Sequence, residues 1–186
     1  MPQPLANLVQ AVADLLSQSR TRIVFAESCT AGLVSASLAR VAGISEFHCG
    51  SAVVYRYDTK TQWLGIPPEM LRDPGPVSES VARAMAVGVL ERTPEAGFAA
   101  AITGHLGPNA PSDQDGLIYI GIARRTAPEP EVKVFRHVLA AEISGLAEAR
   151  AASLREWRQW KAVEQVLTHV RDSLTTLLKQ SLTKPH

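Results

Sequence analysis

The chain has 186 residues with a formal net charge of +1, and 46% of its residues are hydrophobic against 20% charged. This length predicts one domain with a sizeable core, and the ordinary composition excludes intrinsic disorder and a disulfide scaffold. The balanced charge disfavours a nucleic-acid partner, and no apolar run reaches the roughly 20 residues of a membrane-spanning helix. Two cysteines and an N-terminus without a signal-peptide pattern predict a cytoplasmic protein.

The first third of the chain alternates helical and strand patterns. Residues 1–20 carry apolar residues at helical spacing, and the apolar run at 23–26 predicts a strand. Residues 33–41 predict a helix, and residues 49–56 predict a second strand. A short helix is expected over 58–64, because the glycine that follows suits a helix end.

The middle of the chain continues this alternation and then changes. Ser78 is a favoured N-cap and predicts the start of another helix, and residues 98–103 predict a third strand. Residues 104–116 are rich in Gly, Pro and Asn and predict a long loop, which is commonly functional. Residues 117–123 and 132–139 predict two last strands joined as a hairpin.

The C-terminal part predicts one long helix or two over residues 145–180. Apolar residues recur there at steps of three and four, and this stripe needs a partner surface. That surface is either the sheet of the same subunit or a subunit interface. Residues 1–186 therefore predict a single domain, with an N-terminal helix, a sheet core over 22–139 and this helical segment. The expected fold class is α/β, a three-layer α/β/α arrangement with a mixed, mainly parallel sheet.

Ser28 lies where the first predicted strand runs into its helix. In open α/β sheets, ligands bind beyond the carboxyl ends of strands, where helix N-termini offer unpaired N–H groups. The Ser28 hydroxyl is therefore either a nucleophile or an N-cap of the helix. As a nucleophile, it would have the N–H groups of Cys29, Thr30 or Ala31 facing an oxyanion.

A serine nucleophile needs a base within hydrogen-bond reach. Lys60 follows the second strand by a few residues. Burial would lower its pKa and leave a free amine, whereas exposure would make it an ordinary surface lysine. His105, in the long loop, is the other candidate base. Tyr55, at the end of the strand, could donate a hydrogen bond to the nucleophile or relay a proton. Otherwise it is a half-buried strand tyrosine.

A different hydrolase chemistry is also open, with Cys29 as the nucleophile and His105 as its base. A helix N-terminus stabilises a thiolate, which makes a cysteine at such a turn reactive. The alternative for Cys29 is a small apolar residue buried beside Ser28.

The stretch 26–33, AESCTAGL, resembles the AESCTGG signature of the CinA C-terminal domain family, whose enzymatic members are nicotinamide-nucleotide amidases. Further segments resemble the other motifs of the family in register and in order: VAGIS at 41–45, YRYDTK at 55–60 with LGI at 64–66, GPVSE at 75–79 and TGHLGP at 103–108. The resemblance covers about residues 22 to 121.

The resemblance implies hydrolysis of the carboxamide of nicotinamide mononucleotide to nicotinic acid mononucleotide and ammonia, without a metal or cofactor. The serine, tyrosine and lysine of the family match Ser28, Tyr55 and Lys60. Ser28 would attack the amide carbonyl, Lys60 would act as its general base, and Tyr55 would orient or relay. The expected partners are a small nucleotide substrate and further copies of the chain in a homo-oligomer. The segments that match the family predict these substrate-binding residues: Cys29, Thr30, Ala31, Gly32, Thr103, Gly104, His105 and Gly107.

Several positions depart from the family pattern, and three of them belong to the motifs around the expected site. Ala31 stands where the signature has glycine, and His105 and Leu106 replace an Ile-Ala pair in the long loop. These larger side chains predict a more crowded ligand site. They favour an alternative, a catalytically silent member that binds a nucleotide-like ligand or acts as an oligomeric partner. Retention of the serine, the tyrosine and the lysine together favours the amidase.

Overall fold

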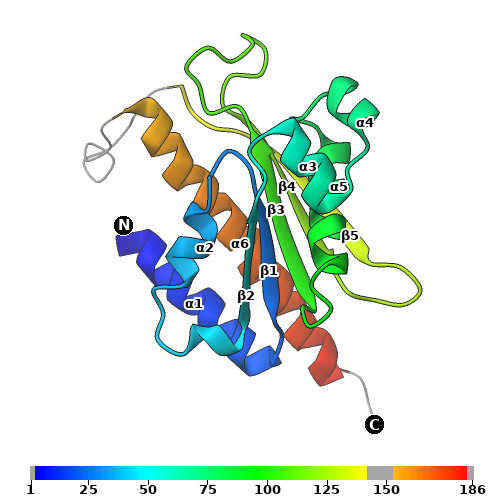
Figure 1. The fold of residues 1–186 in the computed structure, drawn as a ribbon. Coiled ribbons are helices and arrows are strands. Elements are labelled where there is room, and N and C mark those ends of the chain that lie inside the picture. The colour runs from blue at the N-terminus through cyan, green and yellow to red at the C-terminus, as the bar shows by residue number, and fades with distance from the viewer. Residues whose placement is uncertain (1–2, 142–152, 184–186) are drawn as a thin grey trace.

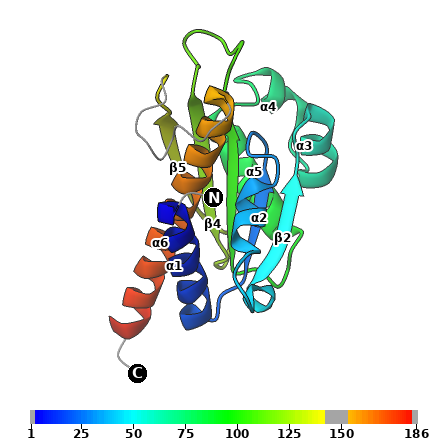
Figure 2. The same cartoon turned by 90° about the vertical axis from the view of Figure 1, so that its left-hand side faces the viewer.

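The computed structural model describes residues 3–141 and 153–183, which form a sheet between two layers of helices (Figure 1). Figure 2 shows the two layers on opposite faces of the sheet. The helices of one layer are α1 (Gln3–Ser19), α2 (Leu33–Leu38) and α6 (Leu154–Thr183). The helices of the other layer are α3 (Tyr57–Leu64), α4 (Pro68–Arg72) and α5 (Glu79–Glu91).

The sheet has five strands in the order β2-β1-β3-β4-β5. β1 (Ile23–Glu27) pairs in parallel with β2 (His48–Val53) and with β3 (Phe98–Gly104). β4 (Leu117–Arg124) and β5 (Glu131–Val138) form the predicted antiparallel hairpin beside β3. Only β4 runs against the other four strands, so the predicted three-layer fold with a mixed, mainly parallel sheet is confirmed.

Alternation along the strands sends side chains to two separate cores. In β1, Ile23 and Phe25 pack with α1 and α6, whereas Val24 and Ala26 pack with α5. The residues on the α5 face are mostly small, and they let this helix lie close to the sheet. A Cβ added at Gly121 in β4 would collide with backbone of α5.

The residues predicted to begin and end helices are largely correct. The Ser78 hydroxyl accepts a hydrogen bond from the Val81 amide at the start of α5, and α3 ends at Gly65 with a φ of 74°. The helix expected over 33–41 ends at Leu38. Tight turns follow it, in which the amides of Arg40 and Val41 donate to the carbonyls of Ser37 and Leu38.

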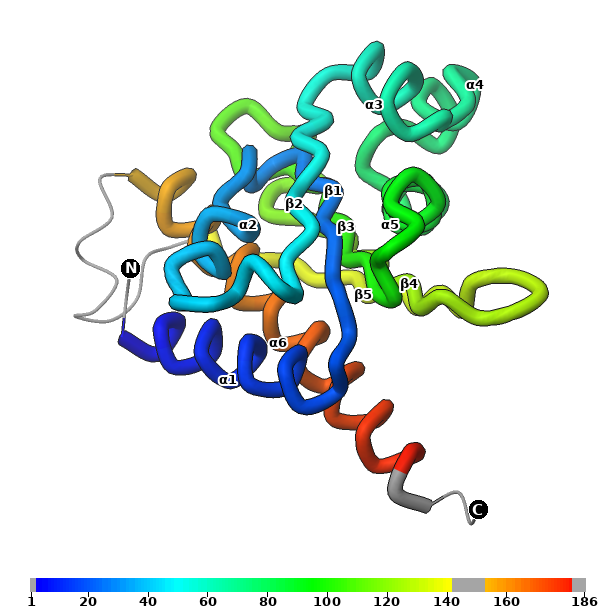
Figure 3. Tube along the Cα trace, turned by 60° about the horizontal axis from the view of Figure 1, so that its bottom comes forward, coloured from blue at the N-terminus to red at the C-terminus, as the bar shows by residue number. Residues whose placement is uncertain are grey.

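The apolar stripe of α6 packs inside the subunit and not at a subunit interface. Its central residues are buried in the same core as α1, and α1 lies along α6 (Figure 3). These residues are Val163, Leu167, Val170 and Leu174. The part of the predicted helix over 145–152 lies outside the described residues. None of the described helices is both long enough and apolar enough to cross a membrane.

Arg158 ties the long loop to α6. Its side chain is fully buried, and its guanidinium makes two hydrogen bonds of 2.7 Å to the Asp115 carboxylate. It also donates to the carbonyl oxygens of Ala140 and Leu106, at 3.0 and 3.4 Å. Because a bidentate pair fixes orientation as well as distance, the loop holds a defined position against the helix.

Replacing Gly88 in α5 by alanine should destabilise the protein. Alanine favours a helix interior by about 1 kcal/mol over glycine. However, a Cβ at Gly88 would collide with the carbonyl group of Leu64, and overpacking typically costs ~1–3 kcal/mol. Urea unfolding should therefore show a lower free energy of unfolding for Gly88→Ala. The half-buried Ala84→Gly in the same helix is the control, with a loss of about 1 kcal/mol. A more stable Gly88→Ala would contradict the close packing of α3 and α5.

Candidate active site

Ser28 and Lys60 meet at the carboxyl end of β1. The Lys60 Nζ lies 2.9 Å from the Ser28 Oγ and 2.7 Å from the Val54 carbonyl oxygen. Lys60 is only 2% exposed, so it is not a surface lysine. Burial lowers the pKa of its ammonium from 10.5 to about 8. A free amine therefore becomes accessible near neutral pH, directly beside a serine hydroxyl.

The local sequence explains how a lysine comes to lie there. β2 ends at Val53, and α3 begins at Tyr57, so the chain turns back over the sheet within a few residues. Lys60 and Leu64 are four residues apart on α3, and both side chains are buried on the face toward the core. The helix thus inserts the lysine along the apolar surface that holds Leu64.

Glu27, the last residue of β1, organises the turn that carries Ser28. It is 1% exposed, and its carboxylate accepts hydrogen bonds from the hydroxyls of Thr30 and Ser51, at 2.8 and 3.1 Å. It also accepts from three backbone amides at the start of α2, those of Gly32, Val34 and Ser35, at 2.9–3.0 Å. A carboxylate at a helix N-terminus is favoured by the unpaired amides and the helix dipole.

This arrangement excludes one of the two roles left open for Ser28, that of the N-cap. α2 begins at Leu33, with Gly32 as its N-cap, and the amides at its start bond to Glu27. Ser28 is therefore not the N-cap of the helix. The sequence did not point to Glu27, because it directly follows an apolar strand. Its position shortly before a predicted helix was the one signal that it could cap that helix.

The backbone amides of the turn can be counted one by one. The amide of Ser28 donates to Ile102, that of Ala31 to the Ser28 carbonyl, and that of Gly32 to Glu27. Within the described part of the chain, neither the Cys29 nor the Thr30 amide donates to another residue, although the Cys29 amide lies against its own thiol. Since buried backbone amides are nearly always paired, two consecutive amides with no partner in another residue form a candidate anion site beside Ser28. Of the three amides predicted to face an oxyanion, that of Ala31 is already used.

Tyr55 lies at the rim of the site and not at its centre. It is 54% exposed, and its hydroxyl accepts a hydrogen bond of 2.9 Å from Arg155. The hydrogen bonds of the described residues include none from Tyr55 to Ser28 or Lys60. Tyr55 is therefore near the pair in sequence and fold but is not joined to it.

The first turns of α6 complete the rim. Arg155 donates to the Gly107 carbonyl as well as to Tyr55, and the Gln159 amide donates to the Cys29 carbonyl at 3.3 Å. These two residues were missed in the sequence because 48 to 130 residues separate them from the motifs they contact. The signal in the sequence was the spacing of four between Arg155 and Gln159, which places both on one face of a helix.

The residues predicted to bind substrate at the end of β3 and in the long loop all have contacts that stabilise the fold. Thr103 is buried and donates to the Pro76 carbonyl at 2.7 Å, and a Cβ at Gly104 would meet the Leu117 carbonyl oxygen at 2.8 Å. The His105 amide donates to the same Leu117 carbonyl. Gly107 has a φ of +67° and lies against Arg158, so a side chain there would be strained.

The departures from the family pattern lie in different surroundings. Leu106 is 1% exposed and packs into the core shared by α1 and α6, and it also lines the cavity between the long loop and α6. Ala31 is exposed and has a φ of 52°, where a glycine is less strained. The expectation that Leu106 narrows a ligand site therefore stays a prediction, and at Ala31 the departure from glycine strains the backbone.

Cys29 does not suit nucleophilic chemistry. Its side chain is buried, and burial raises the pKa of the thiol from 9.0 to about 12. A thiol with this pKa is protonated at neutral pH, whereas the nucleophile is the thiolate. The geometry therefore favours the small buried residue over the Cys29 and His105 pair. No group of three or more potential ligands lies close enough to hold a metal ion within residues 3–141 and 153–183.

The fold and the site together define a class of protein: a three-layer α/β domain with a serine and a buried lysine at the carboxyl end of its first strand. The model of the CinA C-terminal domain matches residues 5–153, and the chain belongs to this family.

Solved structures agree with this assignment. The chain resembles the competence damage-inducible protein A of Klebsiella pneumoniae subsp. pneumoniae, with a TM-score of 0.79 and 25% identity, covering 92% of this chain and 97% of that one. It also resembles the competence/damage inducible protein CihA of Agrobacterium tumefaciens, with a TM-score of 0.72 and 27% identity, covering 94% of each chain.

Curated relatives share the sequence over a shorter stretch. A CinA-like protein of Chlorobium phaeovibrioides is 42% identical over 123 residues, which are 65% of this chain and 28% of the relative. A CinA-like protein of Prochlorococcus marinus is 44% identical over 114 residues, which are 60% of this chain and 26% of the relative. The matched stretches span less than a third of the length of these relatives.

The buried amine should make stability depend on pH in the alkaline range. The folded pKa of Lys60 is about 8, whereas the unfolded chain has the ordinary value of 10.5. Between these values the unfolded state binds more protons, so the free energy of unfolding rises with pH. Urea unfolding from pH 7.5 to 9, up to the ordinary pKa of the Cys29 thiol, should show this rise in the wild type and a flatter curve in Lys60→Met. Equal slopes in the two proteins would show that the lysine is not buried.

Neutralising Glu27 should loosen the turn. In Glu27→Gln, one carboxylate oxygen is replaced by an NH2 group that donates, so at least one amide of α2 and one hydroxyl lose their acceptor. The expected loss in the free energy of unfolding is ~3 kcal/mol. Ser51→Ala, which removes a single hydroxyl donor and keeps the carboxylate, should cost about 1 kcal/mol. A Glu27→Gln loss no larger than that of Ser51→Ala would contradict the capping role.

Proposed function

We propose that this protein hydrolyses a carboxamide, and that its substrate is nicotinamide mononucleotide. The observation that carries the proposal is the 2.9 Å contact between the Lys60 amine and the Ser28 hydroxyl in a buried setting. Family membership supports an amidase-like role, and the motifs around Ser28 and Lys60 are those by which the sequence resembles nicotinamide-nucleotide amidases.

In the first step, the neutral Lys60 amine takes the proton of the Ser28 hydroxyl as the oxygen attacks the amide carbon. The Val54 carbonyl accepts one N–H of the amine and so turns the nitrogen lone pair toward Ser28. The negative charge that develops on the substrate oxygen meets the amides of Cys29 and Thr30. One such donor typically contributes ~3 kcal/mol to the transition state.

In the second step, the Lys60 ammonium returns the proton to the leaving nitrogen, and ammonia departs from the acyl-enzyme. The same amine then takes a proton from water, which attacks the ester and frees the acid and Ser28. Each proton leaves and returns through one group, so the cycle ends with Lys60 neutral again. Tyr55 orients the substrate from the rim, through its bond to Arg155.

A cavity of about 710 Å³ lies between the long loop and the first turns of α6. Ser28 and Lys60 do not line it, but Arg155 does and also contacts Tyr55, so the cavity offers room for the part of a nucleotide remote from the carboxamide. Asn109, Ser112 and Arg155 are among the residues that line it. The Arg158 charge is matched by Asp115, whereas the recorded acceptors of Arg155 are neutral oxygens. Arg155 is therefore the group whose positive charge suits the phosphate of a mononucleotide.

The second candidate is a catalytically silent nucleotide binder. The position of Tyr55 at the rim, without a bond to Ser28 or Lys60, favours it. Binding of nicotinamide mononucleotide with no release of ammonia at any pH would select this reading.

The decisive assay is ammonia release from nicotinamide mononucleotide. Ser28→Ala should lose turnover, and Lys60→Met should lose about 100-fold or more, because a general base typically contributes that much. Lys60→Arg should not restore activity, since a guanidinium stays protonated. In the wild type, kcat/KM should rise with pH to a plateau above about 8, the folded pKa of Lys60.

The control is Cys29→Ala, which keeps the backbone amide and should stay active. Activity that survives Ser28→Ala but is lost in Cys29→Ala would overturn the serine mechanism. Circular dichroism of each variant checks that the fold is retained.

A further inference from the structure

Two histidines from different elements meet end to end beside the β5 edge of the sheet, level with the carboxyl end of β3. His137 lies in β5 and His169 lies in α6, and their Nε2 atoms are 2.8 Å apart. The ring centres are 5.1 Å apart, which is close to this separation plus the two ring radii. The two rings therefore point their Nε2 atoms directly at each other and share one hydrogen bond.

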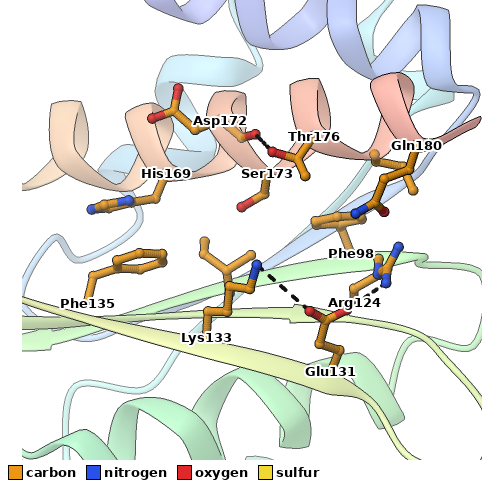
Figure 4. A pocket seen from close by; sticks show the side chains of 12 residues that line it. Phe98, Arg124, Glu131, Lys133, Phe135, His169, Asp172, Ser173, Thr176 and Gln180 are labelled. Atoms are coloured by element: carbon orange, nitrogen blue, oxygen red, sulfur yellow. Dashed lines mark hydrogen bonds and ion pairs between the residues drawn. The ribbon is translucent and has the colours of Figure 1, made fainter. Parts of the chain in front are cut away.

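The surroundings hold this pair in place. His169 stacks on Phe135, with ring centres 3.7 Å apart and planes 12° apart, and His137 is paired through its backbone with Ile118 in β4. His169 also lines a cavity of about 370 Å³ between α6 and the sheet. Figure 4 shows His169 above Phe135 on the wall of this cavity. The hydrogen bond thus joins the edge strand to the long helix.

The pair has two ways to accept protons. When both rings are neutral, one donates its Nε2–H and the other accepts with a bare Nε2. A first added proton goes to the Nδ1 of the donating ring, and the resulting imidazolium still donates to the neutral ring in a charge-assisted bond. A second proton must occupy the accepting Nε2. Two N–H groups and two positive charges then face each other, and the bond is lost.

The charges around the pair do not compensate for that second proton. Burial lowers the pKa of His137 and of His169, the charge of His137 lowers that of His169 further, and Asp172 raises it in part. Asp172 also bonds to its neighbour Arg171. From the sheet, Arg124, Lys133 and Glu131 line the same cavity, where both cations pair with Glu131.

We propose that His137 and His169 form an acid-sensitive latch between β5 and α6. The latch stays closed with no added proton or with one, and it opens when the second proton binds. Its opening would remove this side-chain hydrogen bond between α6 and the edge strand, while the buried apolar stripe keeps the helix on the sheet. The proximal turns of the same helix carry Arg155 and Gln159 to the candidate active site, so the latch can set how firmly that rim is held. The latch does not depend on the proposed reaction.

Nuclear magnetic resonance of the imidazole Cε1–H signals tests the shared proton. In the wild type, the two rings should titrate together in two steps more than about one pH unit apart. In His137→Gln, His169 should titrate in a single step, and His169→Gln should do the same for His137. Two independent single-step curves in the wild type would overturn the latch.

Urea unfolding between pH 7.5 and 5 tests the mechanical consequence. The unfolded chain takes up two protons at this pair where the native protein resists the second, so the wild-type midpoint should fall as the pH drops below 6.5. The fall should be smaller in His137→Gln and in His169→Gln. His48→Gln is the matched control, since burial also lowers the pKa of His48 away from the pair, and it should retain the latch part of the fall. Midpoints of the latch variants that shift in parallel with the wild type would overturn the proposal.

Discussion

The burial of one amine beside one hydroxyl is the constraint on which the rest of the site depends. A lysine ammonium is strongly hydrated, and taking it out of water costs free energy that its partners must offset. At Lys60 the only recorded hydrogen-bond partners in the described part of the chain are a hydroxyl and a carbonyl oxygen. Neither carries a charge, so the environment favours the neutral amine. The same lack of a counter-ion that weakens the protein makes Lys60 a suitable base.

The second constraint is the placement of the one buried carboxylate near this amine. Glu27 does not bond to Lys60; its oxygens are taken by the turn and by α2. Had the carboxylate reached the amine, it would have favoured the ammonium and removed the base. By capping α2 instead, Glu27 fixes Ser28 and leaves the amides of Cys29 and Thr30 without a partner in another described residue. One side chain thus separates negative charge from the base and prepares a place for an oxyanion.

The sequence predicted what local chemistry determines. Strands, caps and the hairpin follow from alternation, Ser78, Gly65 and the turn residues, and the Ser28 and Lys60 pair followed from motif resemblance and the need for a base. The extent of α2 and the identity of its cap could not be predicted, because both depend on where a buried carboxylate sends its oxygens. The burial of Leu106 against α6 could not be predicted either, because it depends on a helix about 50 residues further along the chain.

The contributions of α6 were the least predictable, and they connect the candidate active site with the edge strand β5. Arg155 and Gln159 reach loops about 100 and 130 residues away, and His169 reaches β5. Periodicity identified the apolar face of this helix but not the polar residues at its margins, whose partners are set by the packing of the helix on the sheet. Because a helix transmits displacement as a rigid rod over a few turns, a change at His169 and a change at the rim are not independent. The polar margins of α6 therefore link the site at the strand ends to the protonation of a histidine pair at the edge of the sheet.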